Sequence, residues 1–265
     1  MKNNGLIITL IIILSILVFG LVMLLVFCLN GNFRLLNVFG RLGTKSENII
    51  FDETYEMDSV KNLMILSNAG DIEFKESTDK DIHIVVYGEK SEDLKVTLDN
   101  NELKVDYSEY TNNKVFSFNF YTNDIIVYIP KKYSEEININ SKYGDCKILD
   151  LEKAIININQ DCGDIELGKA KDITIDSKYG DIKIDEVLNK CTIESNCGDV
   201  KINKIEIKED SSIESDFGDI KISKTNDIYV DAKTDLGENK VSTNNRHSEI
   251  TLKIKNDCGD IKVGD

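Results

Sequence analysis

The feature that most constrains this chain is a short motif, Gly-Asp followed by alternating apolar residues, which recurs through its second half. Examples are SKYGDCKI, SKYGDIKI and SDFGDIKI, and an early copy reads SNAGDIEF. The motif glycines are Gly70, Gly144, Gly163, Gly180, Gly198, Gly218, Gly237 and Gly259. From Gly144 onward they recur at a nearly regular spacing, which is typical of one coil of a solenoid. We therefore predict an all-β fold, a β-solenoid (β-helix) of about 17–22-residue coils with Gly-Asp corners.

Alignment on the motif glycine reveals apolar columns seven and five residues before it and two and four residues after it. Alternate residues of a strand share one face, so these columns are predicted to point inward. By the same parity, the residue directly before each glycine is expected inside. The parity changes at Gly-Asp, which predicts a corner, because glycine accepts positive φ and Asp bonds the backbone of turns. The corner acids are Asp71, Asp145, Asp164, Asp181, Asp199, Asp219 and Asp260, with Glu238 in the remaining copy.

Two polar columns accompany the glycines. Three residues before the glycine the chain has Ser67, Ser141, Gln160, Ser177, Ser195, Ser215, Thr234 and Asn256. A nucleophile repeated in every coil is not how an enzyme is built, so we predict a hydrogen-bonding ladder between coils. Lysine follows two residues after most corner acids, which predicts a screened charge ladder and no specific metal site. The predicted exception is the coil where Glu166 replaces lysine beside Asp164.

Outside the repeats, the clearest signal is the apolar run from Leu6 to Leu29, which contains no charged residue. About 20 apolar residues cross a bilayer as a helix, so we predict a membrane anchor. The predicted organisation is an N-terminal transmembrane anchor (1–29), a juxtamembrane linker (30–47), a strand-rich part (48–130) and regular repeats (131–265). The strand-rich part reads either as degenerate coils, which would fill the interval from Gly70 to Gly144, or as a small antiparallel sheet. Within it, Asp99-Asn100-Asn101-Glu102 predicts a hairpin.

Charge and motif content narrow the function classes. The chain carries 32 basic and 47 acidic residues, a formal charge of −15, so nucleic-acid binding is not expected. The sequence has no phosphate-binding loop, nucleophile elbow or zinc-type cysteine spacing, so we predict no enzyme activity and no cofactor. Cys162 and Cys197 share a column but are two coils apart, about 9.6 Å, which is too far for a disulfide. We predict free, buried thiols.

A single N-terminal membrane helix, a strand-rich stretch ending in Ile129-Pro130 and repeated S-x-x-G-D-I-x-I coils resemble the putative-adhesin family, which includes LiaG-like bacterial envelope proteins. The resemblance covers residues 48–265 and implies a non-enzymatic, membrane-anchored domain of the cell envelope, linked to envelope stress. The implied partners are membrane lipid around the helix and a cell-wall polymer or envelope protein. The resemblance implies an extracytoplasmic domain, whereas the positive-inside count and the unpaired cysteines favour the cytosol. We predict the extracytoplasmic side.

The alternative function is a self-assembling, membrane-tethered scaffold similar to the bactofilins. Asp265 follows the last repeat almost at once, so the sequence offers no evident C-terminal cap and predicts an open strand edge. An open edge would allow self-association end to end.

Overall fold

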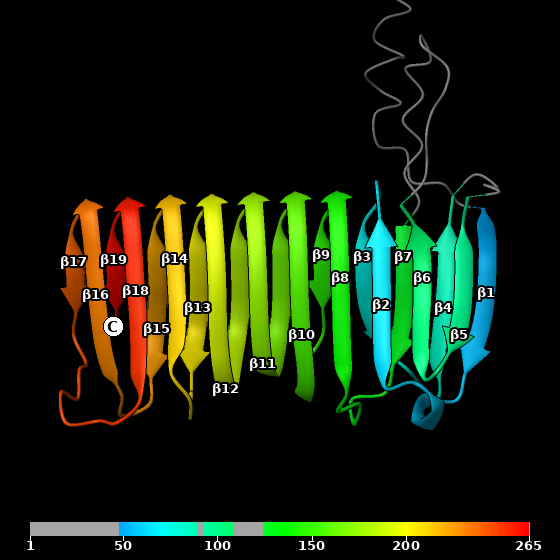
Figure 1. The fold of residues 1–265 in the computed structure, drawn as a ribbon, viewed down its shortest axis with the longest axis horizontal. Helices are drawn as coiled ribbons and strands as arrows, with labels where there is room; N and C mark the ends of the chain where they lie inside the picture. The colour runs from blue at the N-terminus through cyan, green and yellow to red at the C-terminus, as the bar shows by residue number, and fades with distance from the viewer. Residues whose placement is uncertain (1–47, 89–92, 109–123, 265) are drawn as a thin grey trace, which may run out of the picture. The chain divides into compact units, whose positions relative to one another are not determined.

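The computed structural model describes residues 48–88, 93–108 and 124–264. Within these ranges the chain is all-β apart from one short turn of 3-10 helix, η1 (Met57–Ser59). The described strands join into one 19-stranded sheet. The sheet is strongly curled, so that it forms two layers of strands that run in opposite directions (Figure 1).

Each repeat contributes one strand to the front layer and one to the rear layer, joined by a Gly-Asp corner. The front layer of the repeats consists of β8 (Glu136–Tyr143), the C-terminal parts of β10 (Leu151–Cys162), β11 (Ile165–Tyr179) and β12 (Ile182–Cys197), then β14 (Ser211–Phe217), β18 (Thr251–Cys258) and β16 (Tyr229–Leu236). The rear layer consists of β9 (Cys146–Ile148), the first residues of β11 and β12, then β13 (Val200–Ile205), β15 (Ile220–Thr225), β19 (Ile261–Val263) and β17 (Asn239–Val241).

Equivalent residues of neighbouring repeats lie side by side. Ile158, for example, pairs with Ile139 on one side and Ile175 on the other, in parallel strands. Because the register matches residue for residue, the sequence columns become straight rows along the stack. The predicted all-β fold is thus confirmed, and these repeats form a strongly curled sheet that turns at the Gly-Asp corners.

The core lies between the two layers and is filled by the predicted inward columns. Ile156, Ile173, Ile193 and Ile213 of the front layer are at most 1% exposed, as are Ile165 and Ile182 of the rear layer. Isoleucine and valine suit this position because branched side chains pack well on a pleated surface. Burial of one such side chain stabilises the fold by about 1.5–3 kcal/mol.

The interval between Gly70 and Gly144 is not filled by intervening coils, and that prediction is wrong. The coil of Gly70, formed by β2 (Asn62–Ser67) and β3 (Ile72–Glu76), lies directly beside β8 and β9. The Gly70 N–H donates to the Tyr143 carbonyl at 3.0 Å. The regular stack therefore begins before Pro130, with a coil that belongs to the strand-rich part.

The rest of the strand-rich part extends both layers beyond β2 and β3. It consists of β1 (Ile49–Tyr55), β4 (Ile82–Tyr87), β5 (Lys95–Asp99), β6 (Glu102–Tyr107) and β7 (Asp124–Ile129). β6 and β7 pair in parallel with β2 and β3, as a further coil would, whereas β4 runs antiparallel to β1 and β7. The two sequence interpretations, coils and antiparallel sheet, each describe part of this region. The predicted hairpin joins β5 to β6, with Asn100 and Asn101 at φ 49° and 66°.

At the other end, the last two repeats exchange places. β18 and β19 insert between β14–β15 and β16–β17, so the outermost coil is the one that contains Gly237 (Figure 1). The Asn244 side chain covers the outer edge of β16: its Oδ1 accepts the Val230 N–H at 3.0 Å and its Nδ2 donates to the Val230 carbonyl at 2.9 Å. Asn239 donates to the Ala232 carbonyl at 2.6 Å. The prediction of an open strand edge is therefore wrong for the backbone groups of Val230 and Ala232 that these two asparagines bond.

The predicted membrane anchor and linker, residues 1–47, lie outside the described residues. In the part of the chain that the structure describes, no helix has the length and apolar character needed to cross a bilayer.

Gly180→Val should strongly destabilise the fold. The glycine has φ +138°, and a Cβ built on it would lie 1.9 Å from the Gly163 carbonyl oxygen. Strain at such a φ costs about 1–3 kcal/mol, and the backbone clash adds to it. Thermal unfolding followed by circular dichroism measures the effect. The matched control is Tyr179→Val, at the exposed neighbouring position, which should shift stability by no more than about 0.5 kcal/mol. Equal effects of the two substitutions would contradict the close-contact account.

Asn244→Ala should uncover the β16 edge. Loss of the two hydrogen bonds to Val230 is expected to cost about 1–2 kcal/mol and to allow end-to-end association through the freed strand edge. Sedimentation of the detergent-solubilised chain over a range of concentrations measures the association. Asn244→Asp is the matched control, since it keeps the acceptor and loses the donor, and should lie between the wild type and Asn244→Ala. A monomer of unchanged stability in both variants would show that Asn244 does not protect the edge.

Candidate functional site

The corner is a close contact between glycines of neighbouring coils. The motif glycines from Gly144 onward have φ between 124° and 155°. At each of them a Cβ would lie 1.9 to 2.2 Å from the carbonyl oxygen of a motif glycine in the adjacent coil. Backbone bonds hold the corner on both sides: Gly180 N–H donates to the Cys197 carbonyl at 3.0 Å, and Ile182 N–H donates to the Asp199 carbonyl at 2.9 Å. The predicted role of the glycines is confirmed by their φ, and the contact adds a second reason for them.

The corner aspartates form a continuous ladder. The Oδ1 atom of each accepts the backbone N–H of the acid in the next coil, as in Asp181 N–H to Asp164 at 2.9 Å and Asp199 N–H to Asp181 at 3.0 Å. The same bond joins the remaining pairs, Asp71 to Asp145, Asp145 to Asp164, Asp199 to Asp219, Asp219 to Asp260 and Asp260 to Glu238. Each carboxylate thus satisfies a backbone donor of the neighbouring coil.

Glu238 marks the end of this ladder. It lies in the outermost coil, and no described coil stacks beyond it to supply another N–H. A glutamate, whose side chain is longer than that of aspartate, therefore occurs at the one described corner where the carboxylate has no backbone N–H of a further coil to accept.

The electrostatics of the corner follow from these bonds. The Asp219 N–H and then the Lys201 ammonium lower the pKa of Asp199. Lys201 lies 2.9 Å from Asp199 and Lys240 lies 2.6 Å from Glu238, so the predicted charge ladder is confirmed at these two corners. Among the described residues, Asp219 and Asp260 form no ion pair with the lysine two positions further on. Glu166 is paired with Lys147 of the adjacent coil at 3.0 Å. This pair neutralises Glu166 itself, so the predicted lack of a lysine partner for Asp164 stays a prediction. Within the described ranges, no group of three or more acidic, histidine or cysteine side chains is arranged to hold a metal ion.

The polar column inside the corner differs from the prediction. Gln160 donates to the Gly144 carbonyl at 3.1 Å and Asn256 to the Gly218 carbonyl at 2.8 Å, so these longer side chains do link coils. Thr234 also links coils, since its Oγ1 donates to the Gly259 carbonyl at 2.9 Å. The serine hydroxyls do not, although they are buried. The unpartnered oxygens include Ser67, Ser141, Ser177, Ser195 and Ser215. The predicted hydrogen-bonding ladder is wrong for the serine coils.

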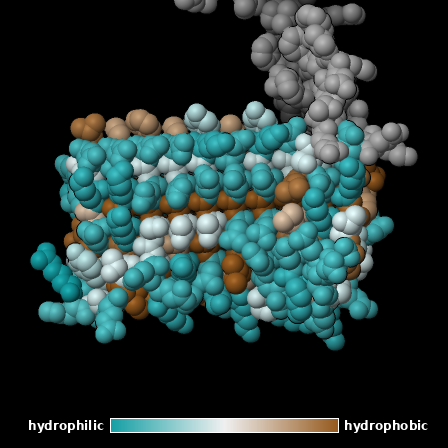
Figure 2. All heavy atoms as spheres, in the orientation of Figure 1, coloured by the Kyte–Doolittle hydropathy of each residue, from teal (hydrophilic) through white to brown (hydrophobic). Residues whose placement is uncertain are grey.

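The residue directly before each glycine is outside, not inside as predicted. Tyr143, Tyr179, Phe217 and Leu236 are 58%, 59%, 60% and 70% exposed. The inward–outward alternation ends two residues before the glycine, one step earlier than parity suggested, so that two consecutive residues face solvent. Figure 2 shows apolar residues along the upper edge of the molecule, where the front strands of Figure 1 end. We call this the corner row; in order along the stack it consists of Ala69, Tyr143, Cys162, Tyr179, Cys197, Phe217, Cys258 and Leu236.

The described cysteines, all free, fall into two classes. Cys146 and Cys191 are buried, and burial raises the pKa of each thiol to about 12. The other three belong to the corner row: Cys197 is exposed, and Cys162 and Cys258 are partly exposed. The prediction that the thiols are buried holds only for the first class, because the corner row is outside.

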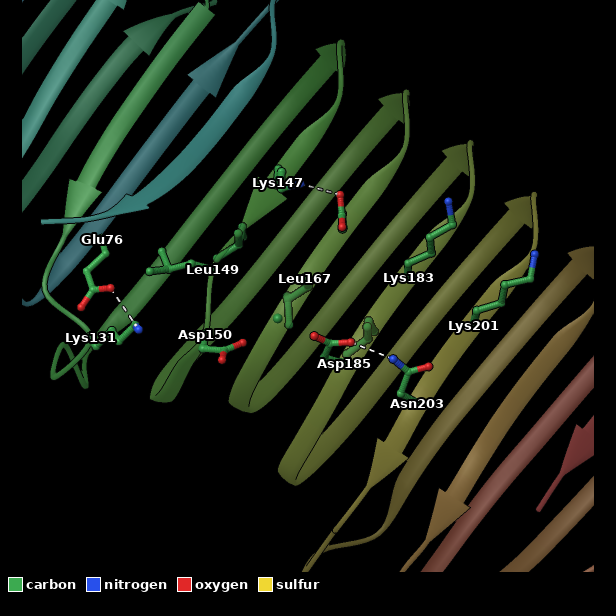
Figure 3. A pocket seen from close by; sticks show the side chains of 14 residues that line it. Glu76, Lys131, Lys147, Leu149, Asp150, Leu167, Lys183, Asp185, Lys201 and Asn203 are labelled. Atoms are coloured by element: carbon green, nitrogen blue, oxygen red, sulfur yellow. Dashed lines mark hydrogen bonds and ion pairs between the residues drawn. The ribbon is translucent and has the colours of Figure 1, made fainter. Parts of the chain in front are cut away.

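A shallow groove of about 660 Å³ lies on the rear layer, close to its N-terminal end (Figure 3). Its charges are largely paired: Lys131 lies 3.0 Å from Glu76, and Asn203 donates to Asp185 at 2.7 Å. The described residues that line it include no serine, cysteine, histidine or aromatic side chain. Its described lining residues thus offer no hydroxyl, thiol or imidazole group and no aromatic platform for a sugar, so the corner row is the stronger candidate site.

The fold and its corners define an all-β protein built from stacked repeats. Residues 60–264 match the family described as Toastrack DUF4097, and the chain belongs to this family. The description of the family marks it as a domain of unknown function. Among curated proteins, none matches the sequence.

The solved structures that the chain matches are distant in sequence. One, described as a putative adhesin from Bacteroides fragilis, is 16% identical, with 82% of this chain and 98% of the other covered and a TM-score of 0.43. A putative cell adhesion protein from Clostridium sporogenes is 13% identical, with coverages of 82% and 99% and a TM-score of 0.38. A putative lipid binding protein from Parabacteroides distasonis is 13% identical, with coverages of 83% and 98% and a TM-score of 0.39.

Asp199→Ala should destabilise the stack more than Asp199→Asn at pH 7. Alanine leaves the Asp219 N–H without its acceptor, at a cost of about 1 kcal/mol, whereas the asparagine carbonyl can still accept it. Because the folded-state pKa of Asp199 is lowered, its ionised form stabilises the fold above the ordinary pKa of about 3.9. That contribution disappears as the pH falls through the lowered value.

Denaturant unfolding at pH 7 and at pH 3 or below tests both parts. The difference between wild type and Asp199→Asn should shrink in acid. An asparagine variant as unstable as the alanine variant at pH 7 would show that the charge, and not the backbone bond, matters at this corner.

Proposed function

We propose that this protein is a non-enzymatic adhesin of the bacterial cell envelope, a β-solenoid anchored in the membrane by the apolar segment of residues 6–29. In this proposal the solenoid is extracytoplasmic and presents its corner row to a partner in the envelope. The membership in the toastrack family and the length of the uncharged N-terminal segment support it.

The observation that carries the proposal is the composition of the corner row. The described part of the chain has six large apolar side chains that are clearly exposed, and four of them belong to this row. Single exposed apolar residues are normal on a soluble surface, whereas a contiguous set points to a contact with another molecule. None of the eight row positions carries a charge, although acids and lysines surround them.

The alternative, a scaffold that polymerises end to end, is less well supported. Such assembly would use the exposed strand edge of the last coil. Asn244 and Asn239 occupy backbone groups of that edge at Val230 and Ala232. We therefore favour the adhesin over the scaffold.

Labelling of intact cells with a membrane-impermeant amine reagent tests the location. We expect labelling of lysines on the rear layer, such as Lys221 and Lys262, because their side chains lie on the outer face of the coils. A cytosolic protein of known location is the control and should react only after lysis. Labelling of this protein only after lysis would overturn the extracytoplasmic assignment.

A further inference from the structure

The corner row has an order that only the structure reveals. Along the stack, large side chains alternate with cysteines: Tyr143, Cys162, Tyr179, Cys197, Phe217, Cys258, Leu236. In the sequence this alternation breaks at the end, because Leu236 precedes Cys258. The exchange of the last two coils restores it. The row is therefore a line of large apolar side chains separated by small gaps.

The spacing of the large side chains in this row indicates which secondary structure of a partner would match it. Neighbouring strands lie about 4.8 Å apart, so large side chains in every second coil recur at about 9.6 Å. Seven residues of an α-helix rise about 10.5 Å, so a heptad repeat nearly matches this spacing. In an extended strand, side chains on one face recur at about 6.7 or 13.4 Å and fall out of step. A helix lying along the row could place its apolar residues beside the cysteines.

The charged residues on both sides of the row indicate which charge a partner must carry. Around Phe217, acids lie on both sides of the row: Asp216 and Asp257 precede it in their strands, and Asp219 and Asp260 follow the glycines. Asp257 is neutralised by Lys255 at 2.7 Å. Asp216, Asp219 and Asp260 form no ion pair with any other described residue, although the last two accept backbone N–H groups. Asp219 and Asp260 also interact electrostatically with Lys201 and Lys240, which leaves Asp216 as the acid with the least compensation. An anionic membrane surface or a second copy of the same acidic row would be repelled.

We propose that the C-terminal half of the corner row, Cys197, Phe217, Cys258 and Leu236, binds an amphipathic α-helix of a protein partner with apolar residues on one face and Lys or Arg beside them. This inference rests on the proposed function, since it names the partner of the same surface. The helix packs its apolar side chains into the gaps at the cysteines, and its basic residues approach the acids on both flanks.

The row cysteines provide an internal reporter for this contact. The experiment uses the full chain in nanodiscs of zwitterionic lipid and a synthetic helical peptide of about five turns with Leu at heptad positions a and d and Lys beside them. Alkylation of each thiol is followed by mass spectrometry. We expect the peptide to slow alkylation of Cys197 and Cys258 about tenfold, with Cys146 and Cys191 unreactive throughout because they are buried. The same peptide with Glu in place of Lys should not protect.

Two variants make the test specific. Phe217→Ser should remove most of the protection at Cys197, and Asp216→Asn should weaken it and reduce its dependence on salt. Leu98→Ser, at an exposed apolar position of β5 away from the row, is the matched control and should change nothing. Circular dichroism confirms that each variant is folded.

Several outcomes would overturn the inference. Equal protection by the Lys and Glu peptides would remove the role of the acids, and unchanged protection in Phe217→Ser would place the peptide elsewhere. If added lipid vesicles without peptide slow the alkylation of Cys197, the row binds a membrane. If alkylation slows as the protein concentration alone is raised, the row binds a second copy of this chain. These results are independent of the labelling of intact cells, so an extracytoplasmic domain with an unprotected row would reject the helix and leave the proposed location intact.

Discussion

The structure depends on the contact between the corner glycines of successive coils. At Gly180 the carbonyl of Gly163 occupies the place that a Cβ would take. This close approach of two backbones fixes where each coil turns, and with it the register of both layers. Because the register is common to all repeats, each sequence column becomes a row with one chemical character. The buried isoleucines, the acids and the corner row are consequences of the same contact.

The aspartate ladder continues into a strand that lacks the Gly-Asp motif. Asp124, the first residue of β7, lies in a strand without a Gly-Asp pair, yet its carboxylate accepts the Asp71 N–H at 3.1 Å. The capping strands at the N-terminal end therefore supply the same bond as a regular coil. At the other end the Glu238 N–H donates the last bond of the ladder to the Asp260 carboxylate. The corner aspartates are thus explained by a backbone donor of the neighbouring coil that each of them satisfies.

Much of this fold could be predicted from the sequence, because alternation and the glycine period are local signals. The columns at Ile175 and Ile182 and the hairpin at Asn100 followed from them. The side-by-side packing of the Gly70 and Gly144 coils could not, since several other strands separate them along the chain. The exchange of the last two coils is equally hidden, because both carry the same motif. The corner row was predicted on the wrong side of the strand for a physical reason. The alternation of buried and exposed residues ends at Lys178, because both Lys178 and Tyr179 are exposed. A prediction that continues the alternation therefore places Tyr179 inside.

The placement of the apolar row also shows how the protein can expose it without a strand-pairing hazard. Exposed apolar residues are dangerous on an edge strand, where free N–H and C=O groups recruit another chain. At the corner the donors are already used: in the coil of Gly180, the N–H groups of Gly180, Asp181 and Ile182 are all bonded to neighbouring coils. At the two ends of the stack, by contrast, the strand edges carry charged residues or are covered by a polar side chain. β5 carries Lys95 and Asp99, and the edge of β16 is covered by Asn244. A contact made at the corner row is therefore limited to side chains, which suits a surface that binds another protein reversibly.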